Sequence, residues 1–145
     1  MANTRDVIAA LRERLPRTGV VTVFIGGSKP VALIAEHDLD VFAVVHDKDV
    51  NKFLDEAQSA LDAVAKEFDV AWTLFKGPIK DASRGLIHFD VYTWENASSS
   101  FKKESPQFFT SFLATAETLF GSDVKQLIHS IPWATTEQEH REFMK

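Results

Sequence analysis

The stretch that decides the fold runs from residue 20 to residue 45 and reads VVTVFIGGSKPVALIAEHDLDVFAVV. Its first part, Val20 to Ile25, is a β-branched and aromatic run without alternation, which is typical of a strand covered on both faces. The run breaks at Gly26 and Gly27, where a turn is expected. Pro30 then favours a short helix through about residue 35. A second continuous apolar strand is predicted from Asp40 to Val45.

The rest of the chain surrounds these two strands with helices and further strands. Asn3 or Thr4 can cap a first helix that ends by Pro16, and apolar residues at steps of three and four predict a long helix over residues 50–68. Residues 70–75 and 86–92 are predicted strands, joined by a turn at Gly77 and Pro78. We therefore expect a mixed, twisted α/β sheet of about four to five strands with flanking helices.

The C-terminal third is predicted to be helical. Ser105 and Pro106 suit a helix start, the stripe of apolar side chains runs from Phe109 to Leu119, and Gly121 is placed to end the helix. A short helical turn over residues 123–128 and a polar helix from about Thr135 are expected to follow.

Composition limits the class of protein. The 145 residues are 45% hydrophobic and 26% charged, without cysteine, which is typical of one soluble globular domain and offers neither disulfides nor thiolate metal sites. No apolar run approaches the roughly 20 residues of a membrane span. A net charge of −5 disfavours sequence-independent binding to nucleic acid. The N-terminus lacks the features of a signal peptide, so we expect a cytoplasmic protein.

Two acidic residues open the second strand. Asp38 and Asp40 are separated by one leucine, so on an extended strand both carboxylates point to one face, roughly 6.6 Å apart along it. Two ionised groups that close repel each other unless a cation lies between them. Oxygen-only ligands suit magnesium or manganese. The alternative is that the pair lies at a solvated loop end.

A third acid, Asp90, lies inside the apolar strand predicted over residues 86–92. An unpaired carboxylate in apolar surroundings costs several kcal/mol, so something must compensate it. The compensation is a metal ion, a salt bridge to a lysine or arginine, or placement on a solvated face. Leu86, His88, Asp90 and Tyr92 share a face of the strand, which makes His88 a candidate partner of the acid.

The turn after the first strand has a possible role of its own. Gly26, Gly27 and Ser28 stand where a strand ends and a short helix is predicted, so backbone N–H groups there would face a bound anion. Taken alone, such a turn is ordinary. Its combination with two same-face acids nine residues later, and with a third acid in a later strand, is the observation that predicts phosphoryl-transfer chemistry.

This set of residues resembles the signature of the DNA polymerase β-like nucleotidyltransferase superfamily. That signature is a hydrophobic strand, a glycine-serine turn, nine to thirteen residues, and two acids separated by one apolar residue, matched here by Gly27, Ser28, Asp38 and Asp40. Residues 119–124 also resemble the segment that closes small members of the family. The similarity covers roughly residues 18–130.

The resemblance implies a metal-dependent enzyme that moves a nucleoside monophosphate from a nucleoside triphosphate to a hydroxyl. It implies that Asp38 and Asp40 hold two Mg²⁺ ions, with Mn²⁺ as the alternative, and that Asp90 completes the metal site and helps draw the proton from the hydroxyl. The triphosphate would lie against Gly27 and Ser28, with Lys29 as a further candidate contact. Two such ions can stabilise both oxygens of an in-line displacement.

The chain also departs from the family pattern. Many relatives carry an arginine-rich stretch after the serine, where this sequence has Lys29 to Ile34, and larger relatives add a helical acceptor-binding domain. Residues 1–130 are expected to form the catalytic domain, with residues 131–145 as its helical tail. The acceptor is then a macromolecule docking on an open cleft, or a small hydroxylated molecule enclosed at an interface between copies.

A second function stays open. A noncatalytic nucleotide-binding or regulatory module of the same fold, acting through a protein partner such as a toxin–antitoxin component, would also account for the missing arginine-rich stretch. The intact acids favour the enzyme.

Overall fold

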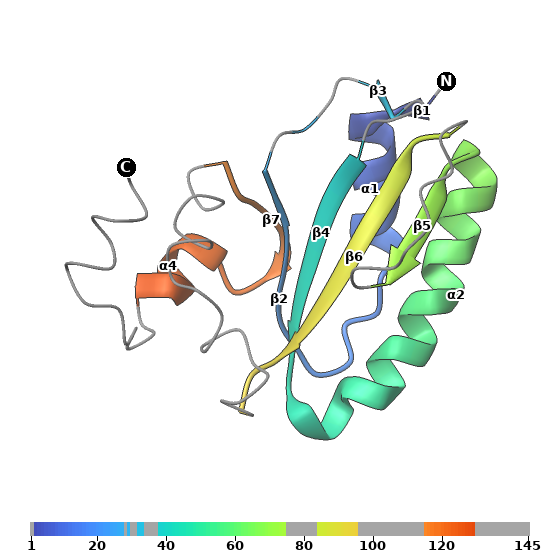
Figure 1. The fold of residues 1–145 in the computed structure, drawn as a ribbon. Coiled ribbons are helices and arrows are strands. Elements are labelled where there is room, and N and C mark those ends of the chain that lie inside the picture. Colours follow the sequence, from blue (N-terminus) through green and yellow to red (C-terminus); the bar gives the residue numbers. More distant parts are fainter. Residues whose placement is uncertain are drawn as a thin grey trace, which may run out of the picture.

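A five-stranded mixed sheet forms the centre of the molecule, and α1 and α2 cover one of its faces (Figure 1). The computed structural model describes residues 2–27, 29, 32–33, 38–74, 84–95 and 115–129. The strand order is β5, β6, β4, β2, β7. The expected mixed α/β sheet with flanking helices is thereby confirmed.

The elements have the following bounds. The main sheet consists of β2 (Val20–Gly26), β4 (Asp38–Val45), β5 (Ala71–Leu74), β6 (Leu86–Thr93) and β7 (Glu117–Gly121). A two-stranded sheet consists of β1 (Ala2–Asn3) and β3 (Ala32–Leu33). The helices are α1 (Thr4–Arg14), η1 (Asp47–Asp49, a 3₁₀ turn), α2 (Val50–Phe68) and α4 (Val124–His129).

The first helix begins and ends as its sequence predicts. The side chain of Asn3 accepts hydrogen bonds from the backbone N–H groups of Arg5 and Asp6, which satisfies donors that have no partner inside the helix. The backbone N–H of Leu15 closes the last turn, and Pro16 follows. The buried side chains of α1 are Thr4, Val7, Ile8 and Leu11.

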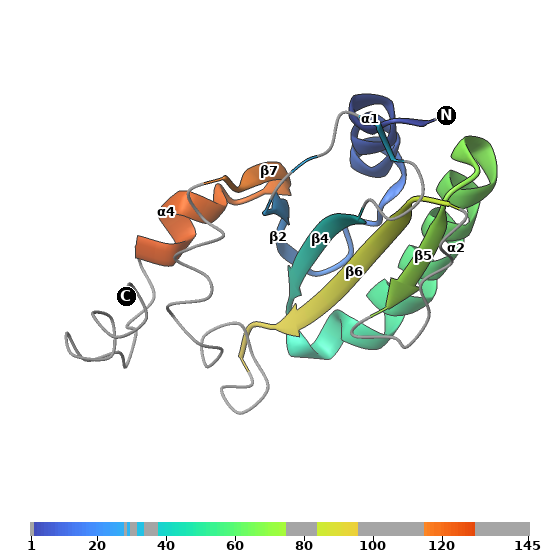
Figure 2. The ribbon, with the colours of Figure 1, turned by 45° about the horizontal axis from the view of Figure 1, so that its top comes forward.

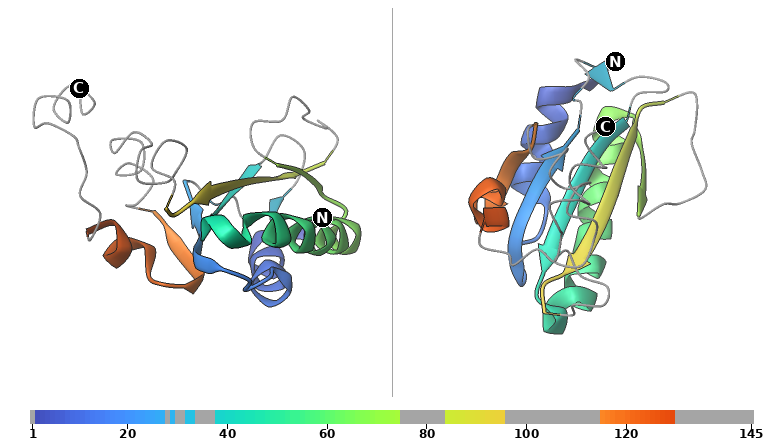
Figure 3. Two further views of the ribbon diagram at one scale, coloured as in Figure 1. Left: turned by 90° about the horizontal axis from the view of Figure 1, so that it is seen from below. Right: turned by 60° about the vertical axis from the view of Figure 1, so that its left-hand side comes forward.

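The long helix α2 packs beside α1 on the same face of the sheet. Figure 3 shows this face in its left view, with both helices below the strands. In the described part of the chain, none of the helices combines the length and apolar character needed to cross a membrane. The buried side chains of α2 are Phe53, Ala57, Ala60, Leu61 and Val64, so the predicted stripe is confirmed.

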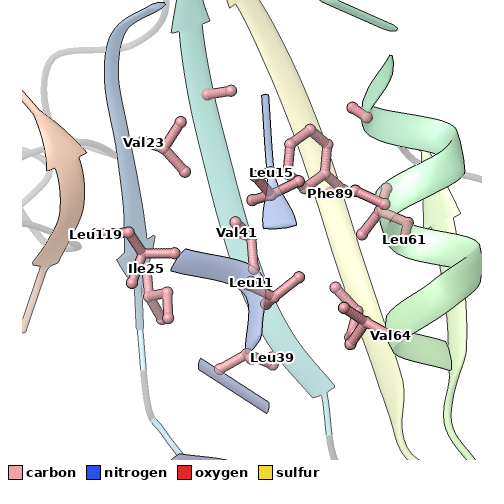
Figure 4. Close-up of a cluster of buried hydrophobic side chains, with 14 of the residues drawn as sticks. Leu11, Leu15, Val23, Ile25, Leu39, Val41, Leu61, Val64, Phe89 and Leu119 are labelled. Atoms are coloured by element: carbon pink, nitrogen blue, oxygen red, sulfur yellow. The ribbon is translucent and has the colours of Figure 1, made fainter. Parts of the chain in front are cut away.

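The core between helices and sheet draws on both layers. Figure 4 shows Leu11 of α1, Leu15 directly after it, and Leu61 and Val64 of α2 facing the strands, together with Val23, Ile25, Leu39, Val41, Phe89 and Leu119. These side chains are at most 6% exposed, and burial of each large apolar group stabilises the fold by about 1.5–3 kcal/mol. Side chains on one face of β2, β4 and β6 thus provide most of the sheet's share of the core.

The opposite face of β2 and β4 carries a second apolar cluster. The rings of Phe24 and Phe42 stack with centroids 5.1 Å apart, and Phe42 stacks on Tyr92 at 6.3 Å. Val44 and Val124 are buried in the same cluster. Both faces of β2 are therefore buried along most of its length, as its continuous apolar sequence predicts.

Strand β4 is the centre of the sheet, with partners of opposite direction on its two edges. It pairs antiparallel with β2, where Gly26 lies opposite Asp40, and parallel with β6, where Asp40 lies opposite His88. The parallel pairing continues to Val45 opposite Thr93. Figure 2 shows β4 between its two neighbours.

The prediction of a helix that ends at Gly121 is wrong for its last turn. Residues 117–121 form β7, which pairs antiparallel with β2, and Leu119 is buried in the main core. Pairing with the free edge of β2 decides the conformation of this short apolar run, which periodicity alone cannot assign. The predicted helix start at Ser105 and the stripe to Leu113 lie outside the described residues.

The short helix predicted through residue 35 is also wrong where the structure describes it. Ala32 and Leu33 form β3, which pairs with Asn3 and Ala2 of β1. The backbone of Leu33 packs closely on Gly85. A Cβ added to Gly85 would lie 2.6 Å from the carbonyl carbon of Leu33. Other positions used in the predictions lie outside the described part of the chain: Pro30, residues 34–37, the turn at Gly77 and Pro78, and the tail over residues 131–145.

The ends of the two central parallel strands are joined by a group of polar contacts, the His46–Glu95 bracket, formed by His46, Asp47 and Glu95. The backbone N–H of Asp47 donates to Glu95 Oε2 at 2.7 Å, and the backbone N–H of Glu95 donates to Asp47 Oδ1 at 3.0 Å. Nδ1 of His46 hydrogen-bonds Oε1 of Glu95. The hydrogen bond from the Asp47 backbone and then that with His46 lower the pKa of Glu95 from 4.5 to about 2.

Substitution of Gly121 tests the end of β7. Its φ is +87°, and an added Cβ would lie 2.7 Å from the carbonyl oxygen of Val21, so Gly121→Ala combines left-handed strain with a backbone clash. We expect the free energy of unfolding to fall by about 1–3 kcal/mol in urea titrations. Ser122→Ala, one residue further and exposed, is the control; equal stability of the two variants would contradict the assigned strand end.

The His46–Glu95 bracket predicts a pH-dependent share of stability. Because the pKa of Glu95 is lowered from 4.5 to about 2 on folding, its contacts stabilise the fold above pH 4.5 and lose that contribution as the pH falls toward 2. Glu95→Gln should therefore lower the free energy of unfolding at pH 7, and the gap to the unsubstituted protein should close between pH 4.5 and 2. Urea unfolding across this range measures the gap, and a gap independent of pH would contradict the assigned contacts.

Candidate functional site

The two acids at the start of β4 lie on one face of the sheet. Leu39 and Val41 are buried in the core under α1 and α2, so the alternation of a strand turns Asp38 and Asp40 to the opposite face. Phe42 follows on that face and joins the second apolar cluster. The side chain of Asp40 is 33% exposed.

The third acid lies on the same face of the neighbouring strand. Phe89 and Val91 are buried in the main core, which turns Asp90 toward the side of Asp38 and Asp40. We call the face that carries these three acids and His88 the aspartate face. The predicted arrangement of all three carboxylates on one face of the sheet is what the structure contains.

The register sets how far apart these acids are. Asp38 lies opposite Leu86, Asp40 opposite His88 and Phe42 opposite Asp90. Asp90 is therefore two positions along the strands from Asp40 and four from Asp38, or about 6.6 Å and about 13 Å at the usual rise per residue. The structure brings Asp40 and Asp90 near each other and leaves Asp38 at the end of the sheet.

His88 lies between Asp40 and Asp90. Its Nδ1 is 3.6 Å from Asp40 Oδ1, and its Nε2 is 3.8 Å from Asp90 Oδ1. Both distances exceed those of hydrogen bonds but are short enough for electrostatic contact. The side chains of His88 and Asp90 are 26% and 19% exposed, so the group is partly withdrawn from water.

The glycine turn lies at the same end of the sheet as the acids. Gly26 is paired with Asp40 across the antiparallel strands, and Gly27 directly after it has a φ of +70°, a conformation that glycine adopts without steric cost. The predicted turn at Gly26 and Gly27 thus lies beside Asp40. Ser28, the third residue of the motif, lies outside the described residues.

Lys29 has a partner two residues before β7 begins. Its Nζ donates to the backbone carbonyl oxygen of Thr115, which ties the segment after the turn to the strand next to β2. The ammonium would have to exchange this contact for one with a phosphate. The sequence contains no signal for this contact, because Lys29 and Thr115 are 86 residues apart.

The donor atoms fit a divalent cation in type. Three carboxylates on one partly exposed face supply the oxygen ligands that Mg²⁺ and Mn²⁺ take. Within the part of the chain that the structure describes, no three His, Asp or Glu side chains already converge as a metal-binding group. Asp40 and Asp90 are instead separated by the ring of His88, so binding of one ion by both acids requires these side chains to rotate.

Sequence reasoning identified His88 as sharing a face with Asp90 and missed its approach to Asp40. The first relation follows from spacing along one strand, whereas the second depends on the pairing of β4 with β6. Neither a family model nor a curated protein matches this sequence. The functional assignment therefore depends on the motifs and on the geometry of the aspartate face.

Proposed function

We propose that the chain is a nucleotidyltransferase that moves a nucleoside monophosphate from a nucleoside triphosphate to a hydroxyl acceptor. The observation that carries the proposal is the placement of Asp38, Asp40 and Asp90 on one face of two paired strands, at the end of the sheet where Gly27 forms a turn. These residues come from three separate segments of the chain. Their shared face supports the proposal, and two-metal catalysis further requires that the carboxylates draw together around the cations.

Each residue has a part in this reaction. Bound Mg²⁺ ions would supply charge stabilisation for the attacking oxygen and the leaving pyrophosphate. Asp38 and Asp40 would hold the cations, and Asp90 would complete the site and accept the proton of the acceptor hydroxyl. The acceptor oxygen bonds to the α-phosphorus as the bond from that phosphorus to the pyrophosphate oxygen breaks. Backbone N–H groups at Gly27 and Ser28 bind the triphosphate.

The surroundings of the aspartates suit this role. Partial exposure of Asp40 and Asp90, 33% and 19%, allows substrate access while reducing the screening of charge by water. The acceptor is a macromolecule or a small hydroxylated molecule, and we place the reaction in the cytoplasm.

A noncatalytic nucleotide-binding module, acting through a protein partner, is the second candidate. Two observations favour it: Lys29 is engaged by the carbonyl of Thr115, and the described carboxylates do not converge as a metal-binding group. Such a module would bind a triphosphate without breaking it. The two candidates therefore differ in the fate of the α-phosphate.

Transfer of label separates the two candidates. The protein is incubated in Mg²⁺ or Mn²⁺ with each nucleoside triphosphate labelled at the α-phosphate, or in parallel at the γ-phosphate, with and without cell extract. We expect the α-label alone to reach an acceptor. Asp40→Asn should lower the rate at least about 100-fold, the order expected when one electrostatic contributor to the transition state is removed.

Asp55→Asn is the matched control, because it makes the same change of charge at an exposed position of α2 and should leave the rate unchanged. Binding of a triphosphate without transfer of either label would favour the noncatalytic module. Transfer of the γ-label would contradict both candidates. Absence of triphosphate binding in either metal would refute the proposed nucleotide site.

A further inference from the structure

The position of His88 suggests a role that the three-acid pattern does not contain. Its two ring nitrogens face different carboxylates, with Nδ1 toward Asp40 and Nε2 toward Asp90. The ring is therefore held between the strands at the point where one cation would have to be shared by the two acids. A bound ion must either displace this ring or use one of its nitrogens.

Geometry favours use of the ring. The 3.6 Å from Nδ1 to Asp40 Oδ1 is about 0.6 Å longer than the roughly 3.0 Å that separates adjacent ligands of one octahedral ion with bonds of about 2.1 Å, so a small side-chain rotation brings both atoms to one ion. On the other side, Nε2 faces the carboxylate of Asp90 at 3.8 Å. A histidine that ligates a metal through one nitrogen and is oriented by a carboxylate at the other is a recurrent arrangement in metalloproteins.

We propose that His88 binds the cation of the aspartate face through Nδ1, together with Asp40, and that Asp90 orients the imidazole from the Nε2 side. This inference rests on the proposed function for the meaning of the site and refines the part of Asp90, which then acts on the cation through His88. It also accounts for the lack of a converged group of three described donors, since Asp90 stands behind the ring.

The choice of metal follows from the added nitrogen. Carboxylate and water ligands alone suit Mg²⁺, whereas an imidazole raises affinity for first-row transition metals in the order Mn²⁺, Co²⁺ and beyond. The aspartate face therefore selects a transition-metal cation such as Mn²⁺ over Mg²⁺. Asp38, further along β4, supplies a carboxylate at the outer end of the site.

Metal binding without nucleotide tests the inference. The affinities of Mn²⁺ and Mg²⁺ are measured by calorimetry at pH 7.5 for the full chain and for His88→Ala. We expect the substitution to weaken Mn²⁺ binding by about 10-fold or more and Mg²⁺ binding by less than about threefold. Asp90→Asn should weaken Mn²⁺ binding by about 10–100-fold through loss of the orienting carboxylate.

His46→Ala is the matched control, because it removes a histidine at the other end of β4 and β6 and should leave both affinities unchanged. Pulsed EPR of Mn²⁺ bound to the unsubstituted protein gives a second measurement that does not depend on the folding of any variant. Coupling to an imidazole nitrogen, altered when histidine is ¹⁵N-labelled, is the expected result. Unchanged or tighter Mn²⁺ binding by a folded His88→Ala, or absence of the coupling, would overturn the inference.

These outcomes are independent of catalysis. Mn²⁺ binding with imidazole coupling but no transfer of the α-label would support the metal site and refute the enzyme. Transfer that proceeds equally well in Mn²⁺ after His88→Ala, with unchanged Mn²⁺ affinity, would support the enzyme and refute the role of His88. Loss of binding in the control variant would show an effect of the fold and would overturn the assignment to His88.

Discussion

The register between β4 and β6 is the constraint on which the rest of the structure depends. It runs without interruption from Asp38 opposite Leu86 to Val45 opposite Thr93. Side chains alternate with a period of two, so a slip of one residue would turn every group on one strand to the wrong face. Apolar residues on the covered face resist such a slip, because it would expose Ile87 and Phe89 and bury His88 and Asp90. The His46–Glu95 bracket fixes the same register at the far end of the strands.

The two faces of the β4–β6 pair carry different kinds of side chain. The face under α1 and α2 is apolar along its length, whereas the aspartate face changes character at its middle. Acids and His88 occupy the end near Gly27, and the stack of Phe24, Phe42 and Tyr92 follows. Phe42 is paired with Asp90, so the carboxylate lies at the boundary between polar and apolar surroundings. Interactions between charges are stronger at such a boundary than in open water.

Periodicity predicts the elements whose stability is local. Helices α1 and α2 have apolar stripes and clear ends, and the continuous apolar runs of β2 and β4 leave little choice of conformation. Residues 117–121 and 32–33 have no such signal: each is a short apolar run whose conformation is decided by a strand far away in sequence, β2 for the first and β1 for the second. Gly121 adds to the ambiguity, because a positive φ ends strands as well as helices.

For the candidate site, relations along one strand were predictable from the sequence, whereas relations between strands were not. Spacing along a single strand gives the shared face of Asp38 and Asp40 and that of His88 and Asp90. The approach of His88 to Asp40 depends on the pairing of β4 with β6, and the sequence of neither strand alone predicts it.

The aspartate face is also where local preference and structure disagree most. Aspartate is disfavoured in strands, yet β4 and β6, both interior strands of the sheet, carry three on one face. Carboxylates on paired strands repel each other, and burial of Asp90 to 19% exposure adds a cost of desolvation. Natural proteins concentrate such conflicts at functional sites and offset them elsewhere in the fold. Here the apolar face of the same two strands, buried under α1 and α2, supplies stability that offsets the cost of placing the acids on the other face.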